Sequence, residues 1–465
     1  MLKEYIDKRK DEIIEEVCNI VRIPSVHEES TDEKKPFGEN ANKALEYILA
    51  LGERLGFRTK NLDGYCGYLE FGEGEEILGI IGHLDVVPVG DGWTYEPFNP
   101  IIDNDKLYGR GTTDDKGPVI AALYAMKAVM DLCKVNKRVR LIVGLNEERD
   151  WKCIEHYKKV EEMPTLGFSP DADFPCIYAE KGLLSIYVSE IYTGEIDSIK
   201  IEKIDYRNNA INVVPKYCSM ILRISKTTNI DEVKDTIEML VSKYEFEIKV
   251  EKIEENKLKV ESFGKAAHAA HPELGENAIS KLIVCLAEVF EIYEVNNNFI
   301  KTISEKINLE TNGESLGIGL KDDMGELTLN VAKLYLENNK IVLGANLRIP
   351  VTYKINFVED LINDSLKDNN LEIEFTDKKE SLYIPKEDEL VQKLCGIYNY
   401  FYGKNEEPIA IGGAKYARAF KNCVSFGAMM PDEEDMCHKA DEYIKTDNLI
   451  NSCKIYAKAI AELTK

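Results

Sequence analysis

Five short segments of this chain carry side chains that could hold metal ions. Each follows an apolar run or a turn, so each would lie where a strand or turn ends. Imidazole nitrogens and carboxylate oxygens are the donors that catalytic zinc sites use. The segments are Gly82-His83-Leu84-Asp85, Thr113-Asp114-Asp115-Lys116, Asn146-Glu147-Glu148, Ser169-Pro170-Asp171 and Cys437-His438-Lys439. Together they indicate a metal site assembled from distant parts of the sequence.

Two imidazoles and three carboxylates in these segments would form a mixed nitrogen and oxygen shell. The candidate ligands are His83, Asp114, Glu148, Asp171 and His438. Five ligands are too few for two closed tetrahedral sites unless one carboxylate bridges and water fills the other positions. Asp114 is the natural bridge, because it begins a predicted helix whose N-terminus favours negative charge. Two ions about 3.5 to 4 Å apart could then share a hydroxide and polarise a carbonyl group.

Two further carboxylates in the same segments could assist that chemistry. Glu147, which is adjacent to Glu148 but would point elsewhere, could take a proton from the water molecule and pass it to a leaving amine. Asp85, two residues after His83, could fix the imidazole tautomer through the second ring nitrogen. Glu147 is therefore the candidate general base, and Asp85 is the candidate residue that orients His83.

Each of these patterns also has an ordinary structural explanation. A single histidine after a strand is more often a hydrogen-bonded structural residue, and an Asp-Asp pair before Lys-Gly is usually a helix cap or a turn. The chain has only six histidines, however, and His83 and His438 both fall in these segments. This coincidence favours the metal site.

Size and composition limit the class of protein. A chain of 465 residues exceeds what one core usually serves, so two or more domains are expected. The formal net charge of −24 argues against nucleic acid as a partner. Charges interrupt every apolar run before about 18 residues and the N-terminus has no apolar signal region, so we expect a cytoplasmic protein without membrane contact.

Cysteine usage is consistent with a reducing compartment. The eleven cysteines are scattered singly and are odd in number, which favours free thiols. Cys437 stands directly before His438, and its thiolate could ligate a metal. Neighbouring side chains rarely point the same way, so the imidazole is the better candidate.

The first part of the chain alternates between helices and short apolar strands, which is typical of an α/β fold. Helical periodicity and apolar runs predict helices over 3–22, 39–57, 117–133 and 152–162, with strands over 77–82 and 139–145. Pro24 would end the first helix. Ligands of open parallel sheets collect beyond the carboxyl ends of the strands, where the candidate ligands fall.

After residue 182 the pattern changes to alternating strands with a few helices, which predicts a second domain. It contains a weak repeat: Ile221–Ile224 precedes a predicted helix at 231–243, as Asn346–Ile349 precedes one at 356–368. From residue 385 the α/β pattern returns, with a last helix at 441–463. Because His438 must join His83, we expect residues 1–182 and 385–465 to form one catalytic domain, into which residues 183–384 are inserted.

These segments resemble the dinuclear zinc hydrolases of the aminoacylase and carboxypeptidase G superfamily, and most of all the PepV-type bacterial dipeptidases. The similarity covers nearly the whole chain. It rests on Gly82–Pro88, Gly109–Gly117, Glu147-Glu148, Ser169–Pro175, Ala179–Gly182 and Gly412-Gly413 with Tyr416. One departure is Arg149-Asp150, because relatives often have a small residue and Gly there. A cation at this position would lower the proton affinity of Glu147 if the two side chains met.

The resemblance implies a zinc-exopeptidase-like catalytic domain with a mixed, largely parallel sheet and flanking helices, plus an inserted α+β lid domain. It implies one ion held by His83, Asp114 and Asp171, and a second held by Asp114, Glu148 and His438. Glu147 would be the general base. Two divalent ions per chain are expected, with Zn²⁺ favoured and Mn²⁺ or Co²⁺ also compatible with these donors.

The resemblance also implies substrate-binding residues in the lid. His268 matches a histidine that stabilises the tetrahedral oxyanion, with His271 as a nearby competitor. Asn212 and Arg348 match positions that hold the oxyanion or the terminal carboxylate, although Arg223 occupies the equivalent place in the other half of the repeat. Backbone amides at Gly412 and Gly413 could approach the same carboxylate, but a plain turn would also explain these glycines.

The resemblance implies a metal-dependent dipeptidase that acts on small unblocked dipeptides through a metal-bridging hydroxide. An N-acyl amino acid deacylase would use the same metals, and a peptide-binding protein on an inactive hydrolase scaffold is a third possibility. Intact Glu147 and five intact ligands disfavour the last. The two similar halves of the lid could provide within one chain the contacts that dimeric relatives obtain from a partner subunit. We therefore expect a monomer.

Overall fold

The computed structural model describes residues 1–192, 198–431 and 433–465, which form two compact units. Unit 1 contains residues 1–179, 383–410 and 415–465, and unit 2 contains residues 180–382 and 411–414. The sequence placed the breaks after residues 182 and 384, close to these positions. It assigned residues 411–414 to the catalytic domain, whereas they belong to unit 2.

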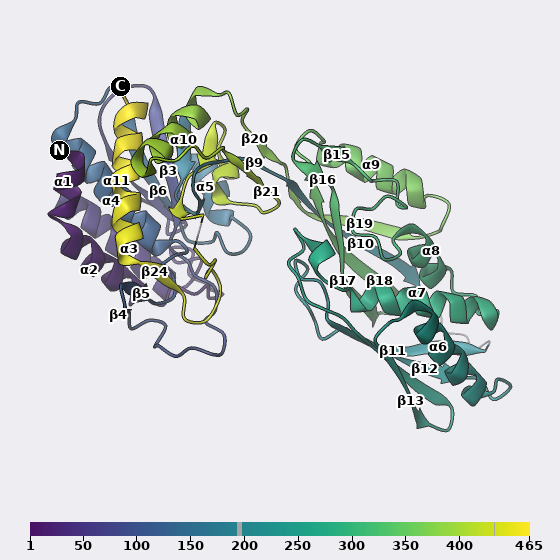
Figure 1. Cartoon of the computed structure of the whole chain (residues 1–465). Coiled ribbons are helices and arrows are strands. Elements are labelled where there is room, and N and C mark those ends of the chain that lie inside the picture. The colour runs from purple at the N-terminus through teal and green to yellow at the C-terminus, as the bar shows by residue number, and fades with distance from the viewer. Residues whose placement is uncertain (193–197, 432) are drawn as a thin grey trace. The chain divides into compact units, whose positions relative to one another are not determined.

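Unit 1 is built around a nine-stranded mixed sheet with the order β1-β2-β6-β3-β7-β22-β9-β20, in which β21 pairs with β9 (Figure 1). The strands β6, β3, β7 and β22 at its centre are parallel, and β1, β2 and β9 run antiparallel to their neighbours. The bounds are β1 Arg58–Leu62, β2 Cys66–Phe71, β3 Ile77–His83, β6 Arg138–Gly144, β7 Leu166–Ser169, β9 Ile177–Glu180, β20 Leu382–Tyr383, β21 Ile409–Ile411 and β22 Cys423–Ser425.

The central strands are buried because the sheet is covered on both faces. Every residue of β3 is buried, as expected for an apolar strand inside a parallel sheet. The helix α4 packs on β3 and β6 and also against the last helix, α11. The helices of unit 1 are α1 Leu2–Asp7, α2 Lys10–Val21, α3 Glu39–Leu55, α4 Lys116–Leu132, α5 Lys152–Val160, α10 Glu389–Tyr402 and α11 Thr446–Leu463, with the short 3-10 helix η2 at Tyr416–Ala419.

The single helix predicted over 3–22 is wrong in one respect, since the structure has two helices there. Arg9, with φ −112° and ψ 12°, leaves the helical conformation between α1 and α2. The amide of Arg9 still donates to the carbonyl of Ile6, so the chain turns without losing this hydrogen bond. The apolar face is kept, because Ile13 and Val17 are fully buried.

The remaining strands of unit 1 form two small sheets beside the main one. In the first, β5 lies between β4 and β24, and in the second β8 pairs with β23. Their bounds are β4 Ile101–Asp103, β5 Lys106–Tyr108, β24 Tyr443–Lys445, β8 Ala172–Asp173 and β23 Ala428–Met429. The strand β24 occupies residues that the sequence assigned to the start of the last helix, and α11 begins only at Thr446.

Unit 2 contains two four-stranded antiparallel sheets, β17-β18-β10-β19 and β11-β12-β14-β13, which share one apolar core with helices (Figure 1). Its strands are β10 Gly182–Ile191, β11 Ile199–Asp205, β12 Tyr217–Ile224, β13 Ile248–Glu254, β14 Lys257–Phe263, β15 Lys321–Asp322, β16 Gly325–Glu326, β17 Thr328–Glu337, β18 Lys340–Ile349 and β19 Glu372–Lys379. Its helices are α6 Ile230–Tyr244, α7 Ala278–Ile292, α8 Asn298–Lys306 and α9 Ile355–Leu366, with the 3-10 helix η1 at Pro272–Leu274.

The two segments of the predicted repeat occupy similar local structures. Ile221–Ile224 ends β12, which is followed by α6, and Asn346–Ile349 ends β18, which is followed by α9. The predicted α/β class with a mixed sheet, parallel at its centre, is confirmed. No helix among the described residues is both long enough and apolar enough to cross a lipid bilayer.

Candidate metal centre and active site

The carboxyl edge of the parallel strands gathers the candidate ligands. The strand β3 ends at His83, and β6 ends at Gly144, shortly before Glu147 and Glu148. The strand β7 ends at Ser169, two residues before Asp171. Because β3 is the parallel neighbour of both β6 and β7, these residues must emerge at the same edge of the sheet.

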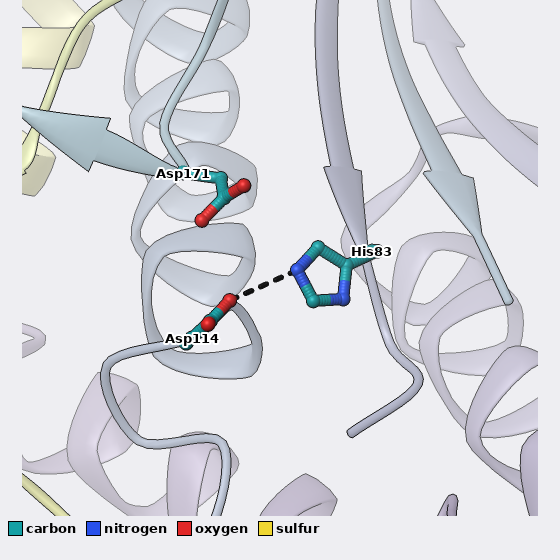
Figure 2. A group of neighbouring side chains, drawn as sticks. All are labelled: His83, Asp114 and Asp171. Carbon is teal, nitrogen blue, oxygen red and sulfur yellow. Dashed lines mark hydrogen bonds and ion pairs between the residues drawn. The ribbon is translucent and has the colours of Figure 1, made fainter. Parts of the chain in front are cut away.

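The first group of donors consists of His83, Asp114 and Asp171. One donor atom from each lies within 4.8 Å of the others, and all three side chains are buried. His83 Nε2 is 3.0 Å from Asp114 Oδ1. Figure 2 shows the Asp114 and Asp171 carboxylates beside the imidazole of His83. Buried polar groups that converge without apolar neighbours between them are suited to a cation.

The second group consists of Asp114, Glu148 and His438. His438 Nε2 lies 3.1 Å from Asp114 Oδ2 and 3.0 Å from Glu148 Oε1. His438 has φ 66°, a left-handed backbone conformation that is uncommon for a residue other than glycine. Since the two oxygens of Asp114 face different imidazoles, this carboxylate has the position that a bridging ligand requires.

Glu147 belongs to a third group with His83 and Glu148, whose donor atoms also lie within 4.8 Å of one another. Asp85 fixes the loop that carries the two glutamates. Its carboxylate oxygens accept hydrogen bonds from the main-chain amides of Glu147 at 3.1 Å and Glu148 at 3.0 Å. His83 Nδ1 lies 3.0 Å from the main-chain oxygen of Asp85 and 3.5 Å from its carboxylate. Asp85 therefore contacts both the imidazole and the glutamate loop.

The carboxylates of this cluster have different proton affinities. Burial raises the pKa of Glu147 to about 7, and the negative charges of Glu148 and Asp114 add to the effect. Burial likewise raises the pKa of Asp171 to about 7, against the opposing charge of Lys415. Burial also acts on Asp114, but hydrogen bonds from His438 and His83 hold its pKa well below the usual value. Asp114 is thus the most strongly ionised of the three.

The pKa values of both imidazoles are raised as well. Hydrogen bonds to Asp114 and Glu148 raise the pKa of His438 to about 10. Burial opposes protonation of His83, but hydrogen bonds to Asp114 and Asp85 hold its pKa well above the usual value. The cluster therefore attracts positive charge strongly, and divalent cations are one way to supply it.

Arg149 and Cys437, which stand beside candidate ligands in the sequence, contact residues outside the ligand groups. Arg149 Nη1 lies 3.6 Å from Glu29 Oε1, and the Arg149 side chain is about half exposed. The shift of Glu147 is therefore governed by burial and by acidic neighbours. The thiol of Cys437 lies 4.0 Å from Met429 Sδ, and among the described residues Cys437 belongs to none of the candidate ligand groups.

A buried ion pair that the sequence did not reveal links the two loops that carry Asp114 and His438. Glu442 is fully buried and accepts hydrogen bonds from the amides of Gly111, Thr113 and Asp114 at 2.9 to 3.2 Å. It also accepts one from Arg110 Nη1 at 2.7 Å. Only the folded structure could identify Glu442, because an acid four residues after a histidine is common in surface segments.

A lysine that the sequence did not single out lies directly at the cluster. Lys415 Nζ is 3.2 Å from Asp171 Oδ1. Burial opposes its charge, but the carboxylates of Asp171 and Asp114 hold its pKa well above the usual value. Its position after Gly412-Gly413-Ala414 did not mark it as a site residue, because a lysine in such a loop is ordinarily solvated.

His268, Asn212 and Arg348, which were predicted in the lid, lie in unit 2. Gly412, which was predicted in the catalytic domain, lies in unit 2 as well. The main-chain oxygen of Asn212 accepts a hydrogen bond from the amide next to His268, at Ala269. A side chain added at Gly412 would contact Ala270. Arg348 on β18 is the register partner of Thr328, whose hydroxyl donates to the main-chain oxygen of Ala269.

His268 and His271 are both exposed but differ in their hydrogen bonds. His268 Nδ1 accepts from the amide of Ala270 at 3.2 Å, which directs the ring proton to Nε2. His271 Nδ1 lies 3.2 Å from the Glu273 carboxylate. The two rings therefore differ in surroundings, because Nδ1 of His268 accepts from a main-chain amide and Nδ1 of His271 faces an acid.

An α/β unit with a histidine and carboxylate cluster at the carboxyl edge of its sheet has the features of a metal-dependent hydrolase. Residues 79–462 match the model of peptidase family M20/M25/M40, and the chain belongs to this family. The protein is thus a metallopeptidase, and the resemblance inferred from the motifs is confirmed at the level of the family.

Relatives and solved structures agree with this assignment. The chain is 39% identical to “Putative dipeptidase YtjP” of Bacillus subtilis, with 98% of each chain covered. It is 35% identical to “Putative dipeptidase SAUSA300_1697” of Staphylococcus aureus, over 100% of this chain and 99% of the relative. Human carnosine dipeptidase 1 has a similar fold, with a TM-score of 0.58, 17% identity and coverage of 100% and 98%. Dug1p of Saccharomyces cerevisiae has a TM-score of 0.58, 14% identity and coverage of 99% and 98%.

Proposed function

We propose that this protein is a metal-dependent dipeptidase that hydrolyses unblocked dipeptides. The names of its full-length relatives support a dipeptide substrate. The observation that carries the proposal is the position of Asp114, whose carboxylate lies between the imidazoles of His83 and His438. A single carboxylate shared by two donor groups is the arrangement that a pair of cations needs.

The donor set fits two divalent cations per chain. His83, Asp114 and Asp171 would hold one, and Asp114, Glu148 and His438 the other. Nitrogen and oxygen donors favour Zn²⁺ and also accept Mn²⁺ or Co²⁺. When bound, such cations polarise a peptide carbonyl group and increase the acidity of water.

The protein's own residues would move the proton. Glu147, with a pKa raised to about 7 by burial, can accept a proton from water and release it to the leaving amine near neutral pH. The hydrogen bonds from the amides of Glu147 and Glu148 to Asp85 keep the base close to His83. We infer that Glu147 is the general base and Asp85 a positioning residue.

We propose that unit 2 supplies substrate contacts from His268, Asn212, Arg348 and the backbone of Gly412 and Gly413. A guanidinium can hold a carboxylate with two hydrogen bonds, which suits Arg348. The R348A variant is expected to raise KM for dipeptides by at least tenfold. Arg223 is a matched control, because it lies in the other half of the repeat and pairs with Glu202 at 2.8 Å. R223A is expected to leave KM unchanged, and equal effects of both substitutions would remove Arg348 from substrate binding.

A substrate panel tests the function itself. The protein is stripped with a chelator, reloaded with Zn²⁺, Mn²⁺ or Co²⁺, and assayed with free dipeptides, tripeptides and N-acetyl amino acids. Metal-dependent release of amino acids from dipeptides is the expected result. Faster cleavage of N-acetyl amino acids would identify a deacylase instead, and inactivity on every substrate after reloading would favour a binding protein.

We also propose a cytoplasmic monomer. All eleven cysteines are free thiols in the structure, as expected in a reducing compartment. Light scattering of the purified protein at micromolar concentration measures the mass directly. A mass of about 53 kDa supports the monomer, and twice that mass would contradict it.

A further inference from the structure

Lys415 brings a positive charge to a cluster whose other side chains are donors for cations. Its Nζ atom is 3.2 Å from Asp171 Oδ1, close enough for a charge-assisted hydrogen bond. The side chain is only 27% exposed, so water screens the charge poorly. Lys415 immediately precedes η2, and the amide of Arg418 donates to its main-chain oxygen, which fixes the start of this helix.

The lysine affects the two donor groups unequally. Asp171, its partner, belongs only to the group formed with His83 and Asp114. In the group with His438, Glu148 is paired with the imidazole. An ammonium group bonded to a ligand carboxylate competes for its lone pairs and repels a cation bound to the same oxygen atoms. The penalty from Lys415 therefore falls mainly on the first group.

We propose that Lys415 makes the two metal positions unequal, so that the cation held by His83, Asp114 and Asp171 binds more weakly and loads second. This inference rests on the proposed pair of cations but does not depend on the substrate. Its consequence is that the supply of free metal controls how much of the protein carries both cations. Lys415 is thus a positioning residue that acts through Asp171.

Metal binding to the stripped full-length protein tests the proposal without any substrate. Titration calorimetry with Mn²⁺ is expected to give two dissociation constants for the wild type that differ by at least tenfold. K415M is expected to tighten the weaker constant by at least tenfold and to change the tighter one by less than twofold. K415R, which keeps the charge, is expected to retain the unequal constants.

The same titration in the H438A variant shows which dissociation constant belongs to which donor group. H438A removes a ligand of the second group only, so the remaining constant should be the weak one, and K415M in this background should tighten it. K439M is the matched control, because Lys439 follows His438 in sequence but bonds the main-chain oxygen of Asp435 at 2.5 Å. It removes the same charge and is expected to leave both constants unchanged.

Several results would overturn the proposal. Unchanged constants in K415M, or weaker binding at either position, would show that the lysine does not oppose the cation. A change in KM for dipeptides without a change in either constant would assign Lys415 to the substrate instead. Circular dichroism and thermal melting identify a misfolded variant, and K415Q replaces K415M in that case. If the protein does not hydrolyse dipeptides, the metal dissociation constants still test the proposal for Lys415.

Discussion

Asp114 is the residue on which the proposed metal centre depends most. Each of its carboxylate oxygens faces a different imidazole, and hydrogen bonds from His438 and His83 hold its pKa well below the usual value. It is therefore an anion in the folded protein at neutral pH. A buried carboxylate shared by two donor groups must be held in a fixed position. The main-chain amide of Asp114 donates a hydrogen bond to Glu442, which fixes the residue.

At the same scale, the substitution E147Q separates proton transfer from metal binding. Glutamine keeps the shape of the side chain but cannot take a proton from water. We expect kcat for dipeptide hydrolysis to fall by roughly 10² to 10⁴-fold, the usual contribution of a general base. Metal content, measured by elemental analysis, is expected to match the wild type. A variant that retains the wild-type rate would exclude Glu147 from the mechanism.

The shifted pKa values predict how pH affects the chelated protein. His438, raised to about 10, contributes stability that is complete below its unfolded value of 6.5 and is lost as the pH rises through 10. Glu147 and Asp171, raised to about 7 by burial, are costly to ionise, so stability also falls as the pH rises toward 7. Both effects lower the stability of the chelated protein as the pH rises. The chelated protein should therefore become less stable between about pH 5 and pH 7. Above pH 7 the buried Lys116, whose pKa is lowered to about 7, opposes the effect of His438.

Thermal melting across that range, with and without added Zn²⁺, provides the measurement. Cations bind the deprotonated ligands, so the loss of melting temperature with rising pH is expected to be smaller in the loaded protein. H438A should reduce the slope of the chelated protein above about pH 7. A melting temperature that rises between about pH 5 and pH 7 in the chelated protein would contradict this assignment of charges.

The sequence was informative about residue types but not about distances. The strand-end motifs were enough to propose His83, Glu148 and Asp171, because histidines and acids are uncommon directly after apolar runs. Lys415 and Glu442 were missed, because their importance comes from contacts with Asp171 and with the amides around Asp114. No local pattern in the sequence records such contacts.

Among the elements, the loops that precede α4 and β24 are joined by the Arg110–Glu442 pair. Removing one partner of a buried pair leaves the other charge uncompensated and costs about 3 to 5 kcal/mol. We expect E442Q to lower the free energy of unfolding by that amount and also to weaken metal binding, because the loops of Asp114 and His438 lose their connection. Chemical denaturation and metal titration measure the two effects separately.

Another buried pair provides the control for E442Q. Glu70 on β2 and Arg140 on β6 lie 2.7 Å apart, and both are buried inside the same sheet. E70Q is expected to destabilise the fold to a similar extent but to leave the metal affinity unchanged. Loss of metal affinity in both variants would mean that general destabilisation, and not the loop connection, explains the effect.

Element boundaries were harder to predict than element types. The periodicity of apolar residues correctly indicated helices at α3, α4 and α6, but it carried the first helix through Arg9. Apolar spacing cannot detect such an interruption, because the buried face continues on both sides of the turn. The start of α11 was placed too early for a related reason, since Tyr443–Lys445 pairs with the distant strand β5.

For the whole molecule, the division into two units predicts a local response to metal. All five proposed ligands lie in unit 1, and unit 2 has an apolar core of its own. Removal of metal is expected to increase hydrogen exchange around β3, the loop of Asp114 and the segment of His438. Exchange in β12 and β14 is expected to stay the same.

Hydrogen exchange with mass spectrometry on the chelated and reloaded protein makes this comparison. D171N, reloaded in the same way, serves as the reference for a protein that lacks one ligand. An equal increase of exchange in both units would show that their stabilities are coupled, contrary to the expectation of separate cores.

The segments of unit 1 are separated in the sequence, and this separation affects when the protein becomes active during synthesis. Residues 180–382 emerge from the ribosome before the segment with His438 and Glu442 is made. A partly synthesised chain therefore lacks one proposed ligand and the partner of Arg110. Growing or prematurely terminated chains would therefore be inert toward the small peptides around them. The activity would be acquired only after the segment with His438 and Glu442 has been synthesised.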